Sequence, residues 1–298
     1  MAEIVDLSRA AGTQPLRTAI PGVVMVKGDV PARQLAAVYE PMIGFTVQGT
    51  KLLTIGGREV ALKGPCYYVI PTHLPAVARV RPGPGGRPYL SIGLALEREP
   101  LQELLRADPC AGSTALVRGF GACPMNVDHC EAWLRLLRLL RNRREIPALA
   151  PIHKREIFYR VLIGPHGPRL RLFLSKGSPL ARITETANWI RKHYDEPIDA
   201  RALAERACMA ATTFHRQFKR ATGMSPIQFQ KHLRLLEARN LMAFEGESAS
   251  SAAFDVGYQS PSQFNREYSR FFGETPARDA AMYRRLGPQG GLVSAPKF

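Results

Sequence analysis

The sequence predicts an α+β protein in which a β-rich N-terminal part precedes an all-helical C-terminal part. Across residues 23–96, short apolar stretches alternate with breaks that contain Gly and Pro, as in an antiparallel sandwich or small barrel. Beyond Pro100, apolar residues instead recur at intervals of three and four, which is the helical period. The 298 residues suit two domains, and a Gly-Ser-Pro break predicts that these domains are 1–178 and 179–298.

Two glycine-containing segments of the β-rich part have a definite interpretation. Residues 53–60 predict a hairpin with Gly56 and Gly57 at its turn. Residues 81–88, which are rich in Gly and Pro, predict a loop. Their glycines lack the combination of a preceding strand and a following helix that a phosphate-binding loop has, so we do not expect that function. Residues 1–20 show no clear period, and we expect them to form a loose arm.

Helices are expected between the β-rich part and the boundary. They span residues 101–105, 127–144 and 152–163. In the second of them, Trp133, Leu136, Leu137 and Leu140 form an apolar stripe between arginines. The stripe either packs in its own domain or joins two copies of the chain, so Trp133, Leu137 and Leu140 are the candidates for contacts in a homodimer.

The C-terminal part contains an internal repeat. The first copy has FHRQF at 214–218 and GMSP at 223–226, and the second has FNREY at 264–268 and GETP at 273–276. Both motifs recur at an offset of fifty residues, whereas Ala204 and Ala207 match Ala253 and Val256 at an offset of forty-nine. The second copy therefore has one extra residue in a turn, around Gln259.

Each copy has the pattern of a helix-turn-helix. Small residues on a first helix allow close packing, a tight turn follows, and a second helix buries aromatic residues four apart. Ser260 can cap the second helix of the second copy, whereas Ala210 provides no cap in the first. Gly223 and Gly273 suit the left-handed residue that follows a helix end.

One helix is expected to connect the two copies. Residues 226–243 have an apolar side formed by Phe229, Leu233, Leu236 and Leu241. A rigid helix of this kind would hold the two units at a fixed distance. Two reading helices roughly 34 Å apart can enter successive turns of the DNA major groove.

These motifs resemble those of the AraC/XylS family of transcription regulators over residues 183–284. The matching segments are residues 203–204, 214–219, 222–226, 234–239, 256–258, 260–264, 272–273 and 276. The resemblance implies sequence-specific binding of double-stranded DNA by an activator or repressor, with RNA polymerase as a further partner.

The N-terminal part resembles one subgroup of the same family. The resemblance rests on residues 37–41, 48–51, 71–75 and 155–162. In that subgroup the N-terminal half is a cupin-like β-barrel with appended helices, which implies a domain that binds a small-molecule effector or dimerises. Cys208, where a turn glycine is common, and Ala252, where a bulky aliphatic residue is common, depart from the family pattern and bear on local stability.

The face of each second helix opposite its aromatic residues is expected to meet DNA. We expect base contacts from Thr212, His215, Arg216, Ser262, Gln263, Asn265 and Arg266. We expect phosphate contacts, which set position without reading sequence, from Lys219, Arg220 and Arg270. Arginine can bond guanine bidentately, and Asn or Gln can bond adenine. Plain solvent exposure is the competing interpretation for each residue.

The net charge of +16 favours a polyanionic partner but does not locate the DNA-binding region. The steepest excess falls in residues 131–180, with 11 basic and 3 acidic residues. That run is either a solvated helix face or a phosphate-contacting surface.

The rest of the sequence predicts neither catalysis nor a metal site. The β-rich part offers only His73 as a histidine, and no catalytic serine or cysteine motif is recognisable, so we expect no enzyme, cofactor or metal. A cupin-type enzyme and a non-specific nucleic-acid architectural protein are the two alternatives.

Cellular location is inferred from cysteines and hydropathy. The five cysteines include no C-x-x-C pair, which favours reduced thiols, although a redox-sensing thiol stays open. No secretory signal or membrane-spanning run is evident, so a cytoplasmic protein without a membrane partner is expected.

Overall fold

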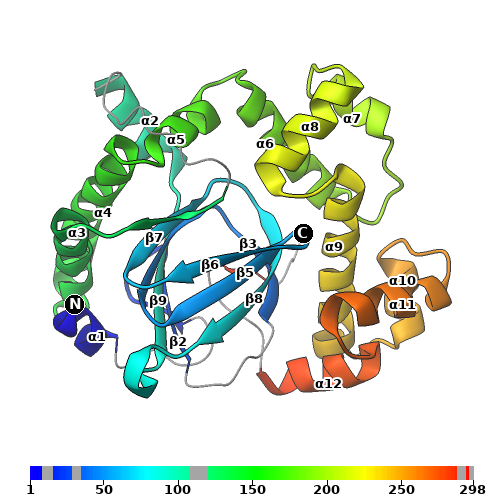
Figure 1. The fold of residues 1–298 in the computed structure, drawn as a ribbon, viewed down its shortest axis with the longest axis horizontal. Helices are drawn as coiled ribbons and strands as arrows, with labels where there is room; N and C mark the ends of the chain where they lie inside the picture. The colour runs from blue at the N-terminus through cyan, green and yellow to red at the C-terminus, as the bar shows by residue number, and fades with distance from the viewer. Residues whose placement is uncertain (9–15, 29–34, 108–119, 287–292, 295–298) are drawn as a thin grey trace.

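The computed structural model describes residues 1–8, 16–28, 35–107, 120–286 and 293–294, as β-sheets flanked by helices (Figure 1). The strands are β1 (Leu16–Arg17), β2 (Val23–Gly28), β3 (Leu35–Tyr39), β4 (Met42–Gln48), β5 (Thr50–Ile55), β6 (Arg58–Lys63), β7 (Cys66–Ile70), β8 (Leu74–Arg81), β9 (Tyr89–Ala95), β10 (Ala122–Pro124) and β11 (Val293–Ser294). The first helices are α1 (Ala2–Leu7), α2 (Arg98–Ala107), α3 (Val127–Arg138), α4 (Ile146–Ile163) and α5 (Gly167–Leu174). The later helices are α6 (Pro179–Lys192), α7 (Ala200–Arg206), α8 (Ala211–Thr222), α9 (Pro226–Asn240), α10 (Ala249–Asp255), α11 (Pro261–Phe272) and α12 (Pro276–Leu286). Short helical turns are η1 (Pro84–Gly86), η2 (Arg143–Glu145) and η3 (Leu241–Glu245), the last of π type.

Two antiparallel sheets form the N-terminal part, and the C-terminal strand β11 joins the second of them by pairing with β3. Their strand orders are β1-β2-β9-β4-β7-β10 and β11-β3-β8-β5-β6. Strand β7 is buried on both faces, since Tyr68 and Ile70 join the core between the sheets while Tyr67 and Val69 join the core beneath α1–α5. The first sheet therefore lies between the second sheet and a layer of helices, which confirms the predicted α+β fold with a β-barrel-like N-terminal part (Figure 1).

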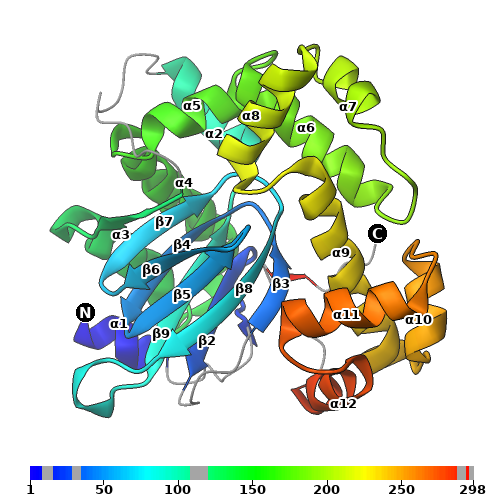
Figure 2. The ribbon, with the colours of Figure 1, turned by 45° about the vertical axis from the view of Figure 1, so that its right-hand side comes forward.

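The two glycine-containing segments have the predicted conformations. Gly56 and Gly57 both have positive φ, 56° and 84°, and connect β5 to β6 in antiparallel register. Residues 82–88 connect β8 to β9 through η1, without a following helix. The hairpin matters below because its tip points toward the C-terminal helices (Figure 2).

Several expected bounds were wrong. Residues 1–8 include the helix α1 rather than a loose arm, because Ile4 is buried beneath it and Glu3 pairs with Arg138. Helix α3 ends at Arg138 instead of residue 144. Helix α4 begins at Ile146 instead of residue 152 and therefore contains Pro151.

The stripe on α3 is core, so the first of the two expected environments is observed, and Trp133 and Leu137 are wrong as candidates for dimer contacts. Trp133 and Leu137 are 1% and 0% exposed, and the Trp133 ring lies 5.6 Å from that of Phe45. Only Leu140 is partly accessible. The period of the stripe is equally compatible with either environment, and here the sheet covers it.

The basic run of residues 131–180 is largely paired within its own half. Arg135 and Arg160 both bind Glu156 at 2.6 and 2.8 Å, and Arg155 binds Glu103. Lys154 binds Glu97 at 2.8 Å. These ion pairs favour a helix surface over a phosphate-contacting one.

The C-terminal helices form two units on either side of α9 (Figure 2). Helix α9 packs on both units and on strands β3 and β8. The chain turns between α5 and α6 at residues 175–178, the predicted boundary. The halves also touch through His73, whose Nδ1 lies 3.0 Å from Asn188 Oδ1. No helix in the described part of the chain is both long and apolar enough to cross a bilayer.

Candidate nucleic-acid interface

The turns of the two units are built alike. In the first, Cys208 has a φ of 51°, and in the second Gly257 has a φ of 86°. Cys208 is the only described non-glycine residue with positive φ, which explains why glycine is common at this position. The first helices of the two units, α7 and α10, begin forty-nine residues apart, whereas the second helices, α8 and α11, begin fifty residues apart. The predicted extra residue therefore lies in the second turn.

The second helices α8 and α11 differ at their starts and agree at their ends. Ser260 accepts a hydrogen bond from the Gln263 N–H, whereas Ala210 supplies no side-chain cap. Gly223 and Gly273 end the helices in the left-handed conformation, with φ of 80° and 79°. The predicted cap of α11, the missing cap of α8 and the left-handed glycines that end both helices are therefore confirmed.

Aromatic side chains fix each second helix against its unit. Phe214 and Phe218 lie 5.5 Å apart between ring centroids, and Phe218 meets Phe229 of α9 edge-on. In the second unit Phe264 and Tyr268 lie 5.3 Å apart. All five rings are buried, which orients the opposite faces of α8 and α11 outward.

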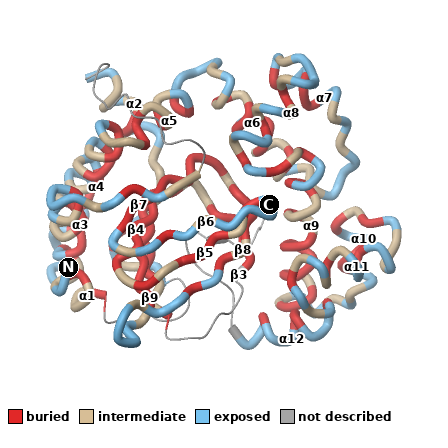
Figure 3. Tube along the Cα trace, in the orientation of Figure 1, coloured by how far each residue is buried: buried red, intermediate tan, exposed pale blue. Residues whose placement is uncertain are grey.

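The residues expected to meet DNA are exposed apart from His215, and Figure 3 shows exposed stretches along both helices. Exposed side chains are Thr212, Arg216, Lys219 and Arg220 on α8, and Ser262, Gln263, Asn265, Arg266 and Arg270 on α11. His215 is half-buried against Phe214, at 5.8 Å between ring centroids. Gln263 donates to Glu267 and Arg266 to the Ser262 carbonyl, so both side chains have contacts along their own helix.

Helix α9 carries a side chain that ties the two units together. Arg234 donates through Nε and Nη2 to the carbonyl oxygens of Tyr194, Asp195 and Glu196. Its Nη1 donates to the carbonyl oxygen of Gly257 at 2.7 Å. Gly257 belongs to the second turn and the other three residues to the segment before α7. Sequence reasoning noted this arginine only as part of the family pattern and missed that it fixes the distance between the units.

A second buried arginine of α9 was also missed. Arg239 pairs with Asp279 of α12 at 2.8 Å, and Asp279 accepts from the Tyr268 hydroxyl at 2.8 Å. Burial is the main reason that the pKa of Tyr268 is raised, so the hydroxyl stays protonated as a donor. The sequence carried one signal for this buried pair, because Arg239 is a charged residue on the apolar side of the helix expected at residues 226–243.

Glu267 of α11 links the second helix to α9. Burial alone would raise its pKa, but hydrogen bonds from Lys231, Gln263 and Tyr258 leave that pKa below its usual value. Lys231 lies 2.8 Å from this carboxylate. The charged carboxylate thus holds α11 on α9 and is unsuited to meet a phosphate.

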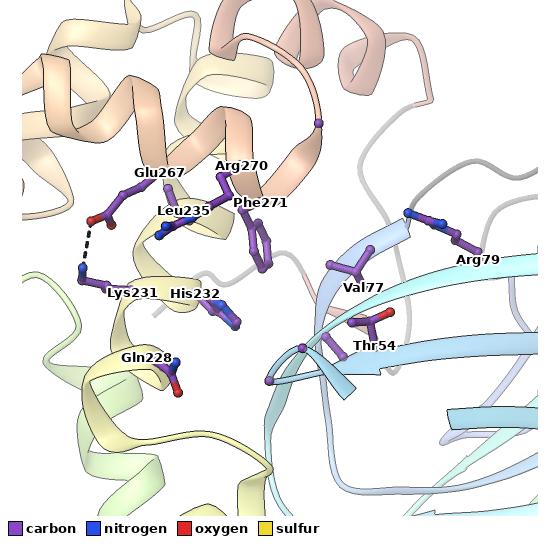
Figure 4. Close-up of a pocket in the computed structure, with 14 residues that line it drawn as sticks. Thr54, Val77, Arg79, Gln228, Lys231, His232, Leu235, Glu267, Arg270 and Phe271 are labelled. Carbon is purple, nitrogen blue, oxygen red and sulfur yellow. Dashed lines mark hydrogen bonds and ion pairs between the residues drawn. The ribbon is translucent and has the colours of Figure 1, made fainter. Parts of the chain in front are cut away.

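The three predicted phosphate contacts line cavities between the two halves. Arg270 lines a cavity of about 540 Å³ between α9, α11 and strands β5 and β8 (Figure 4). Figure 4 shows His232 and Phe271 facing this cavity opposite Val77. Lys219 and Arg220 line a different cavity, of about 440 Å³, beside the tip of the β5–β6 hairpin. The base-contact candidates line neither cavity.

Comparisons with known proteins agree with this architecture. Residues 19–169 match the model of the AraC-type transcriptional regulator N-terminus, and residues 203–281 match a helix-turn-helix domain. The transcriptional activator RhaS of Escherichia fergusonii is 32% identical over 107 residues, covering 34% of this chain and 38% of that protein. RhaS of Pectobacterium carotovorum is 30% identical over 102 residues, covering 34% and 37%. The matches thus span well under half of these relatives.

Two solved structures illustrate the similarity. Wild-type ToxT of Vibrio cholerae with bound unsaturated fatty acid has a TM-score of 0.52 at 8% identity, and the alignment covers 88% of this chain and 94% of ToxT. The DNA-binding domain of AdpA in complex with a target DNA is 34% identical with a TM-score of 0.34, covering 37% of this chain and 98% of that domain. ToxT supports the two-part fold over nearly the whole length. Since the N-terminal family model covers half of the sequence and a helix-turn-helix model follows it, the chain belongs to the AraC-type transcriptional regulators.

Proposed function

We propose that this chain binds duplex DNA at specific sequences and thereby regulates transcription. The observation that carries the proposal is the pair of outward polar faces on α8 and α11, held on one helix, α9. The major groove admits an α-helix, and two helices on a rigid connection can enter it one turn apart. The arginine clamp at Arg234 supports a fixed spacing, because it joins both units through backbone carbonyls.

The proposed roles follow from chemistry and position. Arg216 and Arg266 are suited to guanine, and Asn265 and Gln263 to adenine. Thr212, His215 and Ser262 are proposed as further base contacts. Lys219, Arg220 and Arg270 are proposed to contact phosphates, and their place beside the barrel makes these contacts depend on how the two halves are arranged.

Selection of bound fragments from random duplex DNA, followed by measurement on variants, tests the proposal. Arg216→Ala and Arg266→Ala should each lose about 1–3 kcal/mol of discrimination at one base position, and the two positions should lie about one helical turn apart. Arg278→Ala removes the same charge from an exposed site on α12, outside both recognition faces, and serves as the matched control. Equal weakening of all sequences by both variants would reduce these arginines to phosphate contacts.

A non-specific architectural protein is the competing function. Binding carried by phosphates alone weakens steeply with salt and disappears in excess competitor DNA, whereas specific binding keeps a competitor-resistant component. A selection that enriches no sequence would favour this alternative. The recognition faces favour the specific regulator.

The remaining proposals concern residues 1–178. We propose that this half is a sensor without catalytic activity that also joins two chains, with RNA polymerase as a partner of the whole regulator. The fatty acid in the ToxT structure supports a search for an organic effector, as the folds agree. Dimer contacts would not use the buried Trp133. Ile152, Tyr159 and Ile163 are exposed on one face of α4 and are the better apolar candidates, tested by sedimentation of the intact chain.

A further inference from the structure

The cavity beside the first recognition helix has an unusual charge distribution. It lies between the β5–β6 hairpin, the start of β8, α5 and the last turn of α8, and its volume is about 440 Å³. Four cationic side chains line it: Arg58, Arg169, Lys219 and Arg220. No Asp or Glu is among the described residues that line it. Among the described residues, the cavity therefore carries positive charge without an acidic group beside it.

Two of these cations are held close to each other in spite of their like charge. Arg169 donates to the Ala221 carbonyl at 3.1 Å, which fixes its guanidinium at the end of α8. Burial lowers the pKa of Arg169, and the nearby charge of Arg220 lowers it further. An anion between them would remove this repulsion, and guanidinium groups bind oxyanions through paired hydrogen bonds.

A buried hydroxyl in the cavity wall also has an unmet hydrogen bond. Thr72 is 2% exposed, and its Oγ1 has no hydrogen-bond partner among the described residues. Buried polar atoms are nearly always paired, so a small movement of this wall that exposes the hydroxyl would let it donate to an oxygen of the same anion.

The remaining wall of the cavity is apolar. It is formed by Ile55, Val60, Ile70, Leu74 and Phe120. An inorganic ion would leave this wall in contact with water, whereas a ligand with an apolar body would bury it. The walls together fit a molecule with an anionic head and an apolar body.

We propose that this cavity binds a small organic dianion of the phosphate monoester class with an aromatic or aliphatic body. Three guanidinium groups and one ammonium group exceed the charge that a single carboxylate neutralises, and phosphate oxygens match the planar geometry of arginine. The C-terminal end of α8 carries the partial negative charge of the helix dipole, which disfavours an anion here. This partial charge is smaller than the four full positive charges of the side chains that line the cavity.

The proposed site has a consequence for DNA binding, which rests on the function proposed above. Lys219 and Arg220 line the cavity and are also the proposed phosphate contacts of the first unit. A phosphate monoester in the cavity competes with the DNA backbone for the same two side chains. Ligand and DNA therefore bind with negative coupling, each weakening the other by the same factor.

Calorimetric titration of the full-length chain tests the site directly, with phenyl phosphate as the probe. We expect saturable binding that is at least roughly tenfold tighter than that of benzoate, which has one charge, or of inorganic phosphate, which has no apolar body. No saturable binding of phenyl phosphate at millimolar concentration overturns the proposal. Binding of all three probes with equal affinity also overturns it.

Variants separate the cavity from the general positive charge of the chain. Arg58→Gln should weaken phenyl phosphate roughly tenfold or more and leave DNA affinity unchanged, because Arg58 lies on the barrel. Arg87→Gln makes the same change at an exposed barrel residue outside the cavity and should alter neither affinity. Lys219→Gln should weaken both ligands. Equal phenyl phosphate affinity in the Arg58 and Arg87 variants would assign the binding to bulk charge.

Competition with the selected DNA tests the coupling. Saturating phenyl phosphate should lower DNA affinity roughly five- to a hundredfold in the unchanged chain and have no effect on the Arg58→Gln variant. Benzoate at equal ionic strength is the control. If the chain selects no DNA, the proposed function fails while the calorimetry still decides the site. If DNA binds and phenyl phosphate does not compete, the shared use of Lys219 and Arg220 is wrong.

Discussion

The two helix-turn-helix units share a plan but are held in place by different parts of the molecule. The second unit has a capped helix, a glycine in its turn, and the Arg234 clamp across that turn. The first unit has an uncapped helix and Cys208 in its turn. Its stability depends more on neighbours outside the unit.

The first unit has one neighbour that the second lacks, the tip of the β5–β6 hairpin of the barrel. A Cβ built on Gly56, at the hairpin tip, would lie 2.2 Å from the Gly223 carbonyl oxygen at the end of α8. The two backbones are thus in direct contact, and only glycine permits it. Gly273, which corresponds to Gly223 in the second unit, has no atom of the described residues within 4 Å of its Cβ position. The second unit is therefore fixed within the helical half, whereas the first is positioned partly by the N-terminal half.

The largest effect is expected where the second unit meets its clamp. Gly257→Ala would place a Cβ 2.1 Å from the Asp195 carbonyl oxygen and 2.8 Å from the Arg234 guanidinium, at a φ of 86°. We expect the free energy of unfolding to fall by about 3 kcal/mol, from the backbone clash and the left-handed conformation together. Denaturant unfolding measures it.

Gly273→Ala is the matched control for that change. Its φ is 79°, but its Cβ position is open, so only the conformational cost of about 1 kcal/mol applies. Similar losses in the two variants would mean that the Arg234 clamp yields to a methyl group. The second unit would then be no better fixed than the first.

A smaller effect is expected from pH, because one half-buried histidine lies beside each unit: His73 of the barrel beside α6, and His232 of α9 beside α11. Burial lowers the pKa of His73, beside α6, and of His232, beside Phe271, to about 4, with further contributions from Arg191 and Arg270. In the unfolded chain both titrate near 6.5, so between these values the unfolded state binds more protons. The free energy of unfolding should fall as pH drops from about 6.5 to about 4, by roughly 1–2 kcal/mol for each histidine.

Substitution separates the two histidines. His232→Phe keeps the ring against Phe271 and removes the titration, so it should reduce the loss of stability between neutral and acidic pH. His73→Phe should do the same but also lower stability at neutral pH, because the bond to Asn188 is lost. Unfolding at several pH values gives the comparison. An unchanged pH dependence in both variants would place the sensitivity elsewhere.

How much of this could be predicted from sequence depends on the range of the contact. Ser260, Gly223 and the extra turn residue near Gln259 act within one turn of helix, and their conformations were predicted correctly. The packing of Trp133 depends on a sheet formed by residues far away in sequence, so the helical period left open whether it packs in its own domain or joins two copies. The contact of Gly56 with Gly223 has no local signal at all.

The same distinction holds in the candidate site. The outward faces of α8 and α11 follow from helical period alone, because Phe214 and Phe264 fix the inward side. The positions of Lys219 and Arg220 beside the barrel depend on how two independently patterned halves meet. No period or motif encodes that arrangement.

Exchanging the cap residues tests whether the two units differ in local stability. Ala210→Ser should add a hydrogen bond to the first turn of α8 and raise the free energy of unfolding by about 1 kcal/mol. Ser260→Ala should lower it by about the same amount. Hydrogen exchange would show each change confined to its own unit. No gain from Ala210→Ser would mean that contact with the barrel already satisfies the start of α8.

The smallest effect is expected at Cys208, where the first turn departs from the second. The residue is exposed and has a φ of 51°, so its thiol has little packing to lose, while its Cβ makes the left-handed backbone costly. Cys208→Gly removes that cost of about 1–2 kcal/mol but gives the unfolded chain more freedom, by about 0.5–1 kcal/mol, so a net gain of roughly 0.5 kcal/mol is expected. Cys208→Ala keeps a Cβ and should change little, which separates backbone conformation from thiol chemistry. Arg182 donates to the Cys208 carbonyl in every variant, so the turn keeps its main contact. If glycine gives no gain over alanine, the conformation of this turn does not limit the first unit, and its dependence on the barrel is the larger difference between the two.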